Sequence, residues 1–477
     1  MKKIIISKLF LYRYRFVIGY LILGLAFAVL LFILPIIAQN GLSAAEMESA
    51  TNSYYLGHSG ITNGDLIDLP YRLLQKLSIM IFGLSAYSVK LPSIIIGLVL
   101  GFLFILLLNR WFKNNVSLLA SCLIILSTPF LFLAGSGTPL IMLVFWPTLL
   151  LWLGSKIQGE KRPKPLYSFI FGIAMLLSIF TPYMLYFAIF CVVFVLCQPH
   201  LRFIVKTLPK LLLILEILII ILGVSILAVN IYQHPNTIIG LLFSANFSIE
   251  SFFPNIFNGF APVFSWHSTI ESVFLSPLIS LPILALALIG LFSTTKGFFA
   301  SRNSIATILI IFCIIITGFN PNAAIFIILP FSILIAHGLK YILEKWYGLF
   351  PENPYARVSA IIPLAILYGI IIVPGLLQYI YGYRYNPNIA NEFNYNLGVI
   401  NKNLHEGTFV VTKNFNFYKI LEDSTNLNII SEVPNGEEYF AVLGKLDNNN
   451  YEINQIITSP MRENSDIIYL YTVKKGE

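Results

Sequence analysis

Long apolar runs separated by short polar segments make up most of the chain. A membrane-spanning helix needs about 20 mostly apolar residues, and eleven segments follow that template, several of them shorter than it. They cover residues 16–38, 91–109, 116–133, 139–154, 166–180, 183–196, 211–229, 274–291, 305–317, 323–337 and 358–379. The pattern predicts an α-helical polytopic membrane protein.

The composition agrees with this prediction. Charged residues make up 11% of the 477 residues and hydrophobic residues 57%, whereas a soluble globular chain carries about 25% charge. The net charge of +8 comes from scattered Lys and Arg, so nucleic-acid binding is not indicated. No Walker, dinucleotide-binding, zinc-binding or Gly-x-Ser-x-Gly motif occurs in the sequence, which disfavours nucleotide hydrolysis and hydride transfer.

The distribution of Lys and Arg predicts the orientation of the spans. Basic residues are concentrated in the N-terminal segment and in alternate loops, whereas the loops of opposite parity hold only Arg72, Lys76 and Lys90. Cytoplasmic loops carry the excess of Lys and Arg, so we expect a multi-pass protein of the cell membrane with a cytoplasmic N-terminus. An odd number of spans then places the C-terminal tail outside the cytoplasm.

The composition changes after residue 380 toward Asn, Glu, Lys and Tyr. We predict strands at 408–412, 427–430, 439–443 and 467–473, and helices at 415–422 and 451–457. We therefore expect two domains, a transmembrane domain over 1–380 and a small extracytoplasmic α/β domain over 381–477. The first of these contains two large outer loops, at 39–90 and 230–273.

Acidic residues of the first outer loop are the leading candidates for catalysis. These acids are Glu46, Glu48, Asp65 and Asp68. Transfer of a sugar from a lipid phosphate needs a base for the acceptor hydroxyl, and Glu46 is a candidate. The phosphate leaving group needs nearby cations, and the loop offers Arg72, Lys76 and Lys90. A solvated loop with ordinary surface charges fits the same spacing.

Residues 69–82 of the first outer loop have the pattern of a surface helix. Leu69, Leu73, Leu77 and Ile81 share one face, so this face is expected to contact the membrane. The opposite face carries Arg72, Gln75 and Lys76. We expect Arg72 and Lys76 to point toward the headgroups, and Gln75 to be more accessible than Leu73.

Two further residues have both a functional and a structural interpretation. His267, in the second large outer loop, is a candidate substrate contact, although an interfacial histidine is an equally simple interpretation. Glu216 lies inside an apolar run, and an acid within a membrane span indicates either function or a hydrogen bond between helices. We favour the interhelical role for Glu216.

Several short motifs resemble those of the GT-C membrane glycosyltransferases, in particular the branch of protein mannosyltransferases and lipid A aminoarabinose transferases. The stretch 41–50 (GLSAAEMESA) is similar to the acidic motif that opens the first outer loop of that family. Glu46 falls on its second acid, Ala45 occupies the first, and Glu48 lies close by. The stretch 68–71 (DLPY) is similar to the acid-Lys-Pro element of the family.

The most specific resemblance follows this element. It consists of 82–85 (FGLS), then 89–93 (VKLPS), then Gly97. Further along, 320–321 (NP), 329–330 (LP) and 338–339 (GL) are similar to the ninth and tenth spans of the family. The resemblance covers residues 1–380, and the tail resembles only loosely the soluble domain that many members carry.

The resemblance implies an inverting glycosyltransferase that acts at the outer membrane face. Its donor would be a polyprenyl-phosphate-linked sugar that enters laterally from the bilayer, and its acceptor a lipid, a glycan or a protein. Glu46 would be the catalytic base, with Asp68 second and Glu48 third. No cofactor is certain, and a divalent cation would be compatible with the chemistry.

Two departures from the family pattern keep other functions open. Leu69 replaces the usual lysine of the acid-Lys-Pro element, so Arg72 or Lys76 would have to bind the phosphate. The turn 136–141 (SGTPLI) lacks the aspartate common in the family. A non-catalytic, degenerate member of the fold is one alternative. A transporter or flippase for a lipid-linked precursor is another, although polar residues at the midplane and internal repeats would be expected for it.

Overall fold

The structure is a computed structural model that describes residues 10–473 apart from short gaps. These gaps are 39–40, 58–65, 160–164, 208, 244–246, 266–268, 272–273, 296–300, 353–354, 356–358, 387–388, 390, 394–396, 398–399, 401–402, 405–407, 413, 423–424, 426, 434–438, 447–450 and 459–466. The candidate residues Asp65 and His267 lie outside the described residues.

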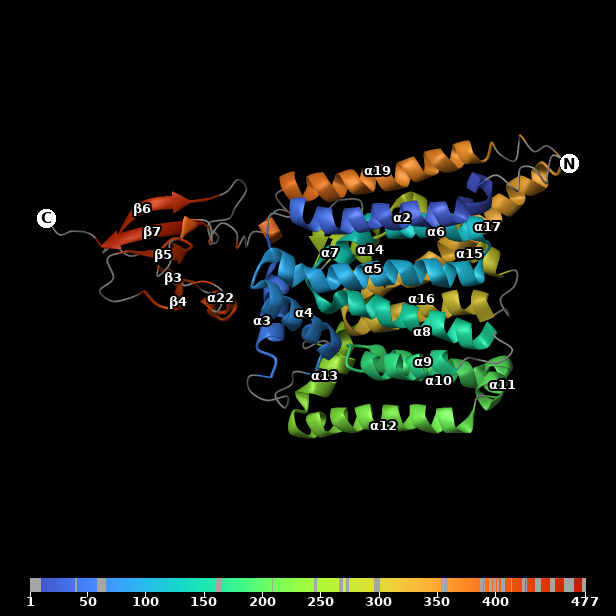
Figure 1. The fold of residues 1–477 in the computed structure, drawn as a ribbon, viewed down its shortest axis with the longest axis horizontal. Coiled ribbons are helices and arrows are strands. Elements are labelled where there is room, and N and C mark those ends of the chain that lie inside the picture. The colour runs from blue at the N-terminus through green and yellow to red at the C-terminus, as the bar shows by residue number, and fades with distance from the viewer. Residues whose placement is uncertain are drawn as a thin grey trace.

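A bundle of apolar helices forms the larger part of the described chain (Figure 1). Among the described residues, six helices are long and apolar enough to cross a membrane: α2 (Phe10–Ile37), α5 (Ala86–Trp111), α8 (Met142–Gly159), α12 (Lys210–Gln233), α17 (Ile328–Leu349) and α19 (Ile361–Tyr385). A bent pair, α6 (Asn114–Ile125) and α7 (Thr128–Gly135), gives a seventh candidate span. Four shorter apolar helices complete the set: α9 (Pro165–Ser178), α10 (Met184–Cys197), α15 (Leu281–Thr295) and α16 (Ser301–Phe319).

These helices correspond in order to the eleven predicted segments, and the predicted fold class is confirmed. The bend of 60° between α6 and α7 follows from Pro129, which cannot continue the preceding helix. The eighth segment starts later than predicted. Residues Phe274–Ser276 form strand β2, which pairs with β1 (Thr269–Glu271) as a short antiparallel hairpin before α15 begins.

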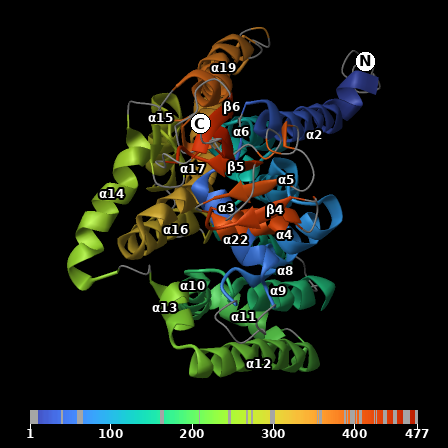
Figure 2. The same cartoon turned by 90° about the vertical axis from the view of Figure 1, so that its left-hand side faces the viewer.

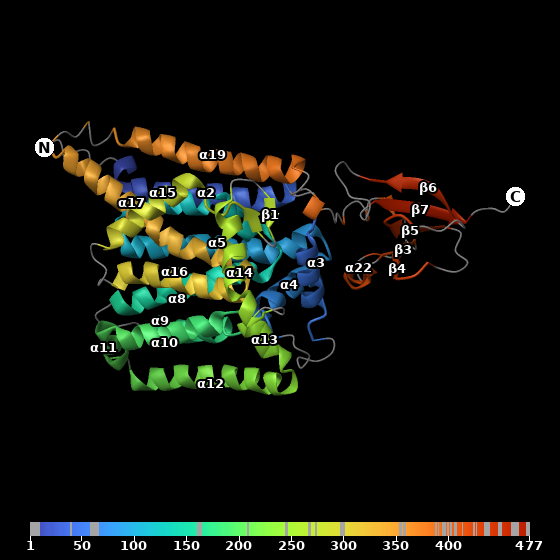
Figure 3. The same ribbon diagram turned by 180° about the vertical axis from the view of Figure 1, so that it is seen from behind.

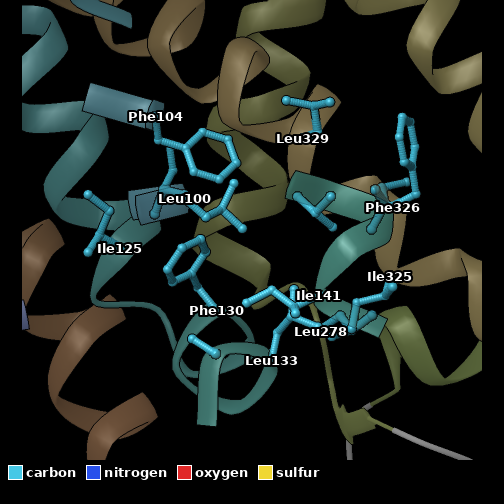
Figure 4. Packing of buried hydrophobic residues seen from close by; sticks show 14 of the residues in the cluster. Leu100, Phe104, Ile125, Phe130, Leu133, Ile141, Leu278, Ile325, Phe326 and Leu329 are labelled. Atoms are coloured by element: carbon cyan, nitrogen blue, oxygen red, sulfur yellow. The ribbon is translucent and has the colours of Figure 1, made fainter. Parts of the chain in front are cut away.

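Close packing holds the helices together. Figure 4 shows Phe104, Phe130, Leu133 and Phe326 among the side chains that fill the centre of the bundle. The rings of Phe104 and Phe130 lie edge to face with their centroids 5.7 Å apart, an arrangement that aromatic pairs favour. Since lipid tails are as apolar as these side chains, the packing itself stabilises the bundle.

Small residues allow the closest helix contact. A Cβ on Gly290 of α15 would lie 2.0 Å from the Leu334 carbonyl oxygen, and one on Gly338 of α17 would lie 2.2 Å from that of Leu286. Both distances are too short for any side chain, so only glycine permits α15 and α17 to approach this closely. The 338–339 motif therefore has a packing role.

One polar contact joins two helices inside the bundle. Ser168 of α9 donates a hydrogen bond of 2.5 Å to Glu216 Oε1 of α12. Glu216 also packs on Gly172, where an added Cβ would lie 3.1 Å from its Cγ. This geometry agrees with the interhelical role that we favoured for Glu216.

Short elements cross one end of the bundle. Helices α3 (Ala44–Tyr54) and α4 (Leu69–Phe82) lie at the end that faces the C-terminal strands (Figures 1 and 3). The remaining connecting elements are α11 (Pro199–Thr207), α13 (Asn236–Leu242), α14 (Phe252–Phe264), η1 (Pro139–Ile141), η2 (Ile249–Ser251), η3 (Pro321–Ile327) and η4 (Asn391–Phe393). Helix α2 begins at the opposite end of the bundle (Figure 1).

Helix α4 has the bounds that the sequence predicted, and its apolar face is exposed as expected. Leu73, Leu77 and Ile81 are 50%, 55% and 63% exposed, which suits contact with lipid. The prediction that Gln75 is more accessible than Leu73 is wrong, because the Gln75 side chain is 0% exposed. The face opposite the leucines packs on protein instead of reaching solvent.

The C-terminal strands form a five-stranded mixed sheet in the order β4-β3-β5-β7-β6. The strands are β3 (Phe409–Val411), β4 (Asn428–Ile430), β5 (Tyr439–Leu443), β6 (Tyr451–Ile457) and β7 (Ile468–Val473). Strand β3 pairs in parallel with β4 and β5, and α22 (Phe415–Glu422) connects β3 to β4. Strand β7 pairs antiparallel with both β5 and β6.

One predicted helix in this region is wrong. Residues Tyr451–Ile457 form the edge strand β6 and pair with β7, with a register shift between Ile453 and Gln455. The interior residues of β6 are all exposed, so one face is not selected for burial and the alternation typical of a strand is missing from the sequence. The remaining strands and α22 lie where the sequence placed them.

The sheet region packs on the end of the bundle through an apolar cluster of its own. Met47 and Ala50 of α3 contribute to this cluster, together with Phe417, Tyr418 and Leu421 of α22. The Tyr55 hydroxyl also donates to the Asn416 carbonyl oxygen at 3.2 Å. In the end-on view of Figure 2, α3 and α22 lie next to each other.

Candidate functional site

A buried ion pair anchors the beginning of the segment 39–90. Glu46 Oε2 lies 3.6 Å from Lys90 Nζ and accepts a hydrogen bond from Ser43 N at 2.9 Å. Glu46 Oε1 accepts from Gly137 N at 2.7 Å, and Lys90 donates to the Gly41 carbonyl oxygen at 3.1 Å. The side chains of Lys90 and Glu46 are 3% and 1% exposed. The alternative of a solvated loop with ordinary surface charges does not hold for Glu46, because both of its carboxylate oxygens have partners inside the protein.

Gln75 connects the same elements through its amide. Its Oε1 accepts hydrogen bonds from Ser49 at 2.9 Å and Ser53 at 2.7 Å, both on α3. Its Nε2 donates to the carbonyl oxygens of Val89 and Gly137 at 3.0 Å each. All four hydrogen-bonding positions of the amide are satisfied, so this one side chain fixes α3, α4, α5 and the 136–138 turn relative to one another.

The most specific motif of the sequence has a structural explanation in this network. Gly83 ends α4 with φ = 68°, a value that favours glycine. Ser85 is the N-cap of α5 in a capping box with Ser88. Ser93 lies 2.7 Å from the Tyr71 hydroxyl of α4. Together with Lys90, these residues hold α4 and the beginning of the segment 39–90 against α5.

A cavity of about 400 Å³ lies beside this network. Its charged lining side chains are Glu48 of α3, and Asp68 and Arg72 at the start of α4. Its polar lining residues further include Ser49, Asn52, Thr138, Thr181, Tyr183, Asn320 and Asn322. The cavity therefore brings together three of the predicted site residues from two separate segments, α3 and the start of α4.

Asp68 occupies an unusual position in the cavity wall. It adopts a left-handed conformation with φ = 56° at the N-terminus of α4, and its backbone N–H donates to the Phe180 carbonyl oxygen at 2.8 Å. Its side chain is 8% exposed. Burial raises the pKa of the Asp68 carboxyl to about 7, an effect that Arg72 opposes. A carboxyl with a pKa near neutrality can accept a proton under ordinary conditions.

Tyr183 also lines the cavity and shares the unusual backbone conformation of Asp68. It is the second non-glycine residue with positive φ among those described, at 65°, and its N–H donates to the Leu241 carbonyl oxygen at 2.8 Å. Residues held in such conformations concentrate at functional sites. Asn320 lies nearby in the lining, and its side chain accepts from Asn322 N at 2.9 Å, which explains the 320–321 motif.

Aromatic rings extend from one side of the cavity. Phe243 lines it, and its ring stacks on Phe247 at a centroid distance of 5.0 Å. Phe319 contacts both rings, at 5.3 Å and 5.5 Å. Phe252 adds a further contact to Phe319 at 5.6 Å, and its neighbour Phe253 is 78% exposed. These rings form a continuous apolar surface from the cavity to the outside of the bundle.

The remaining predicted binding residues lie elsewhere. Lys90 pairs with Glu46 and does not line the cavity. Lys76 donates to the Leu56 carbonyl oxygen at 2.6 Å and is also outside the lining. His267 lies outside the described residues. Arg72 is therefore the predicted phosphate ligand that the structure places in the cavity.

Sequence reasoning missed the uncharged part of the site. Asn52, Thr138 and Tyr183 come from three separate elements, and no short motif links them. The one available signal was the break near Thr181-Pro182 between two short apolar runs, since irregular backbone at membrane depth must line a cavity or be buried in protein. No three His, Cys, Asp or Glu side chains cluster for metal binding in the described part of the chain.

Comparison with known proteins supports the resemblance. The family model described as dolichyl-phosphate-mannose-protein mannosyltransferase matches residues 70–226. No curated protein matches the chain in sequence. ArnT from Cupriavidus metallidurans, in a crystal structure with undecaprenyl phosphate, is similar with a TM-score of 0.58 and 12% identity, over 95% of this chain and 98% of that one.

Two structures of an oligosaccharyltransferase from Archaeoglobus fulgidus are also similar. The apo form has a TM-score of 0.51 and 11% identity, over 86% of this chain and 64% of that one. The complex of AglB with an inhibitory peptide and a dolichol-phosphate has a TM-score of 0.50 and 13% identity, over 88% and 64%. The fold and the matched motif region together confirm the predicted resemblance: the chain has the fold of the GT-C membrane glycosyltransferases.

Proposed function

We propose that this protein is an inverting glycosyltransferase that moves a sugar from a polyprenyl-phosphate donor to an acceptor at the outer face of the membrane. The observation that carries the proposal is the cavity in which Arg72, Asp68 and Glu48 meet. A cation for the phosphate and carboxylates for the acceptor are the groups that this reaction needs.

The donor would bind with its phosphate at Arg72. A guanidinium offers paired N–H donors that match phosphate oxygens. The aromatic surface of Phe243, Phe247 and Phe319 leads from the cavity to the outside of the bundle, so it offers a path for the prenyl chain. The structures of ArnT with undecaprenyl phosphate and AglB with dolichol-phosphate support a donor of this class.

Asp68 takes the role of base in this proposal in place of Glu46. The acceptor hydroxyl oxygen attacks the anomeric carbon from the side opposite the phosphate, and its proton passes to the Asp68 carboxylate. The bond between the anomeric carbon and the phosphate oxygen breaks, and the electron pair leaves on the phosphate, whose charge Arg72 stabilises. Glu48 is positioned to orient the acceptor hydroxyl.

The same proposal includes an orientation of the chain in the membrane. Helix α2 begins at the end of the bundle opposite the sheet (Figure 1), which is compatible with a cytoplasmic N-terminus and an extracytoplasmic C-terminal region. Reporter fusions at Glu477 and in the loop 156–164 test it. An extracytoplasmic reporter at Glu477 and a cytoplasmic one in the loop are expected, and the reverse result would contradict the orientation.

A transfer assay tests the activity. Purified protein is incubated with radiolabelled polyprenyl-phosphate sugars and membrane extract, and release of polyprenyl phosphate is measured. Arg72→Ala is expected to reduce the release of polyprenyl phosphate by about 10²–10³-fold, the usual effect of removing a hydrogen-bond donor that stabilises a developing negative charge. Arg110→Ala is a matched control, because Arg110 is exposed in the last turn of α5. No release by the wild type with any donor would favour the non-catalytic alternative.

A further inference from the structure

A second cavity lies on the other side of α3, between this helix and α22. Its volume is about 440 Å³, within the range of about 300–1,000 Å³ for ligand pockets. Its lining includes Glu48, Thr51, Asn52, Asn414, Phe415 and Asn416. We call this cavity the α3–α22 groove.

The groove rests on a rigid base. Met47 and Phe417, which lie below its polar rim, are 5% and 3% exposed and belong to the apolar cluster that joins α3 to α22. The hydrogen bond from the Tyr55 hydroxyl to the Asn416 carbonyl oxygen also joins the segment that follows α3 to α22. A groove fixed in this way needs little reorganisation when a ligand binds.

The groove is continuous, through two residues, with the cavity of Asp68 and Arg72, which we call the donor cavity because the proposed function places the donor there. Glu48 and Asn52 line both cavities, and their spacing of four positions places them on one face of α3. A molecule in the groove can therefore extend past Glu48 toward Asp68 and Arg72. This is the geometry that an acceptor needs, since its hydroxyl must reach the donor from outside the donor cavity.

We propose that the α3–α22 groove binds a neutral, polyhydroxylated glycan as the acceptor. This inference rests on the proposed transferase function and narrows its acceptor to one chemical class.

The chemistry of the lining favours a polyol. The amides of Asn52, Asn414 and Asn416 each offer a donor and an acceptor, and none has a hydrogen-bond partner among the residues that the structure describes. The Glu48 carboxylate can accept from two hydroxyl groups at once. Phe415 is half-buried beside them and offers an aromatic face to the C–H groups of a sugar ring.

The charge of the lining favours a neutral acceptor over an acidic one. Glu48 is the one charged residue that lines the groove among those described. Lys419 Nζ lies 5.6 Å from the ring centroid of Phe415, but it is already paired with Glu422 Oε2 at 2.6 Å. A phosphorylated or carboxylated acceptor would therefore place its charge next to the Glu48 carboxylate, which costs affinity. A neutral glycan meets no such penalty.

The backbone around the groove favours a glycan over a peptide. Extended peptides commonly bind by adding a strand to an exposed sheet edge. The groove is formed by α3 and the beginning of α22, whereas the edges of the sheet are β4 and β6. Side-chain amides and a carboxylate therefore provide its recognition groups.

A binding experiment that needs no transfer tests the proposal. Saturation-transfer NMR on the full-length protein in detergent micelles is recorded with neutral trisaccharides of gluco, manno and galacto configuration. A capped Ser-Thr tetrapeptide and a short-chain phosphatidylglycerol serve as the peptide and lipid probes. At least one trisaccharide is expected to bind saturably, and the other two probes are not.

Variants locate the binding. The double change Asn414→Ala and Asn416→Ala is expected to weaken trisaccharide binding about tenfold, the equivalent of one to two lost hydrogen bonds. Asn454→Ala, an exposed asparagine on β6 of the same sheet, is expected to leave binding unchanged. No saturable binding of any trisaccharide, equal binding by the double variant, or preferential binding of the peptide or the lipid would overturn the proposal.

The design separates this proposal from the transferase function. Arg72→Ala removes the side chain proposed to bind the phosphate of the donor. This variant is expected to bind the trisaccharide as the wild type does. Trisaccharide binding without any transfer from polyprenyl-phosphate sugars would refute the proposed transferase function and still support the glycan site. Transfer activity without trisaccharide binding would refute the glycan site alone.

Discussion

Glu46 and Glu48 are two residues apart on α3 and have opposite environments. Glu46 points into the protein, where three described groups contact its carboxylate: Lys90, Ser43 and Gly137. Glu48 is exposed and lines both the donor cavity and the α3–α22 groove. Positions two apart on a helix lie on different faces. The acid that stabilises the fold and the acid that is available to a ligand therefore point in different directions from the same helix.

Helix α4 repeats this division. Gln75 is buried and connects four elements, while Arg72, one turn earlier, lines the donor cavity. On α3 the acid that falls on the family motif, Glu46, supports the scaffold and Glu48 faces the cavity. On α4 the order is reversed, because Arg72 follows the 68–71 motif directly and faces the cavity, whereas Gln75 supports the scaffold. The comparison teaches that a motif identifies the region of a site more reliably than it identifies the reacting group.

The largest effect is expected on transfer activity and concerns Asp68, which lines the cavity. Asp68→Asn is expected to reduce transfer by about 10²–10⁴-fold, because loss of a general base has this magnitude. Asparagine tolerates the left-handed backbone at this position, so the fold is retained. Transfer rates of the purified variant check the prediction. A rate within threefold of wild type would remove Asp68 from the mechanism.

The pH dependence sharpens the same prediction. With a pKa of about 7 for Asp68, wild-type transfer should fall as the pH drops below 7, and the residual rate of Asp68→Asn should not. The raised pKa also means that the protonated carboxyl favours the folded state. Its contribution to stability is complete below pH 4 and is lost as the pH rises through about 7, whereas Asp68→Asn lacks this loss.

The second largest effect is expected on stability and concerns the buried acid, Glu46. Glu46→Ala leaves the Lys90 ammonium buried without its carboxylate and is expected to cost about 3–5 kcal/mol of stability. Thermal unfolding in detergent measures it. The matched control is Glu48→Ala on the same helix, for which we expect a change within about 0.5 kcal/mol.

A double variant distinguishes the ion pair from general packing. Lys90→Met in the Glu46→Ala background removes the unpaired charge and should recover part of the lost stability. Equal instability of the single and double variants would show that the Glu46–Lys90 pair is not the cause.

The sequence predicted elements better than it predicted which way their side chains point. The eleven apolar segments and the bounds of α4 and α22 follow from hydropathy and periodicity, and these depend on local residues. The partners of Glu46 and Gln75 include Gly137, which is distant in sequence. No local pattern reports such contacts, so a buried acid was interpreted as an exposed one.

An exposed strand was predicted wrongly for the opposite reason, whereas one face of α4 repeats the error made for buried polar residues. Strand β6 has no buried face and was predicted as a helix. The leucine face of α4 was predicted correctly, yet the polar face opposite to it was assigned to solvent because polar residues usually lie there. The structure shows that this face covers protein, and its polar groups are satisfied by α3 and α5.

The third effect is that of Gln75. Gln75→Leu keeps the approximate volume but removes four hydrogen bonds, which leaves the hydroxyls of Ser49 and Ser53 and the carbonyl oxygens of Val89 and Gly137 without this partner. One buried group without a partner costs about 1–3 kcal/mol. We expect a loss of stability in this range or somewhat above it, with Leu73→Gln as the exposed control. Cysteine labelling at Leu73 and at Gln75 should modify only the former.

The smallest effect is expected at Glu48. Glu48→Gln keeps the size of the side chain and one of its two acceptor oxygens, and it changes no hydrogen bond among the described residues. Thermal stability should therefore stay at the wild-type value, while the KM for the acceptor rises about tenfold and kcat changes less, since weaker hydrogen bonding of a substrate has this magnitude. A large loss of kcat with unchanged KM would instead assign the base to Glu48 and leave Asp68 a positioning role.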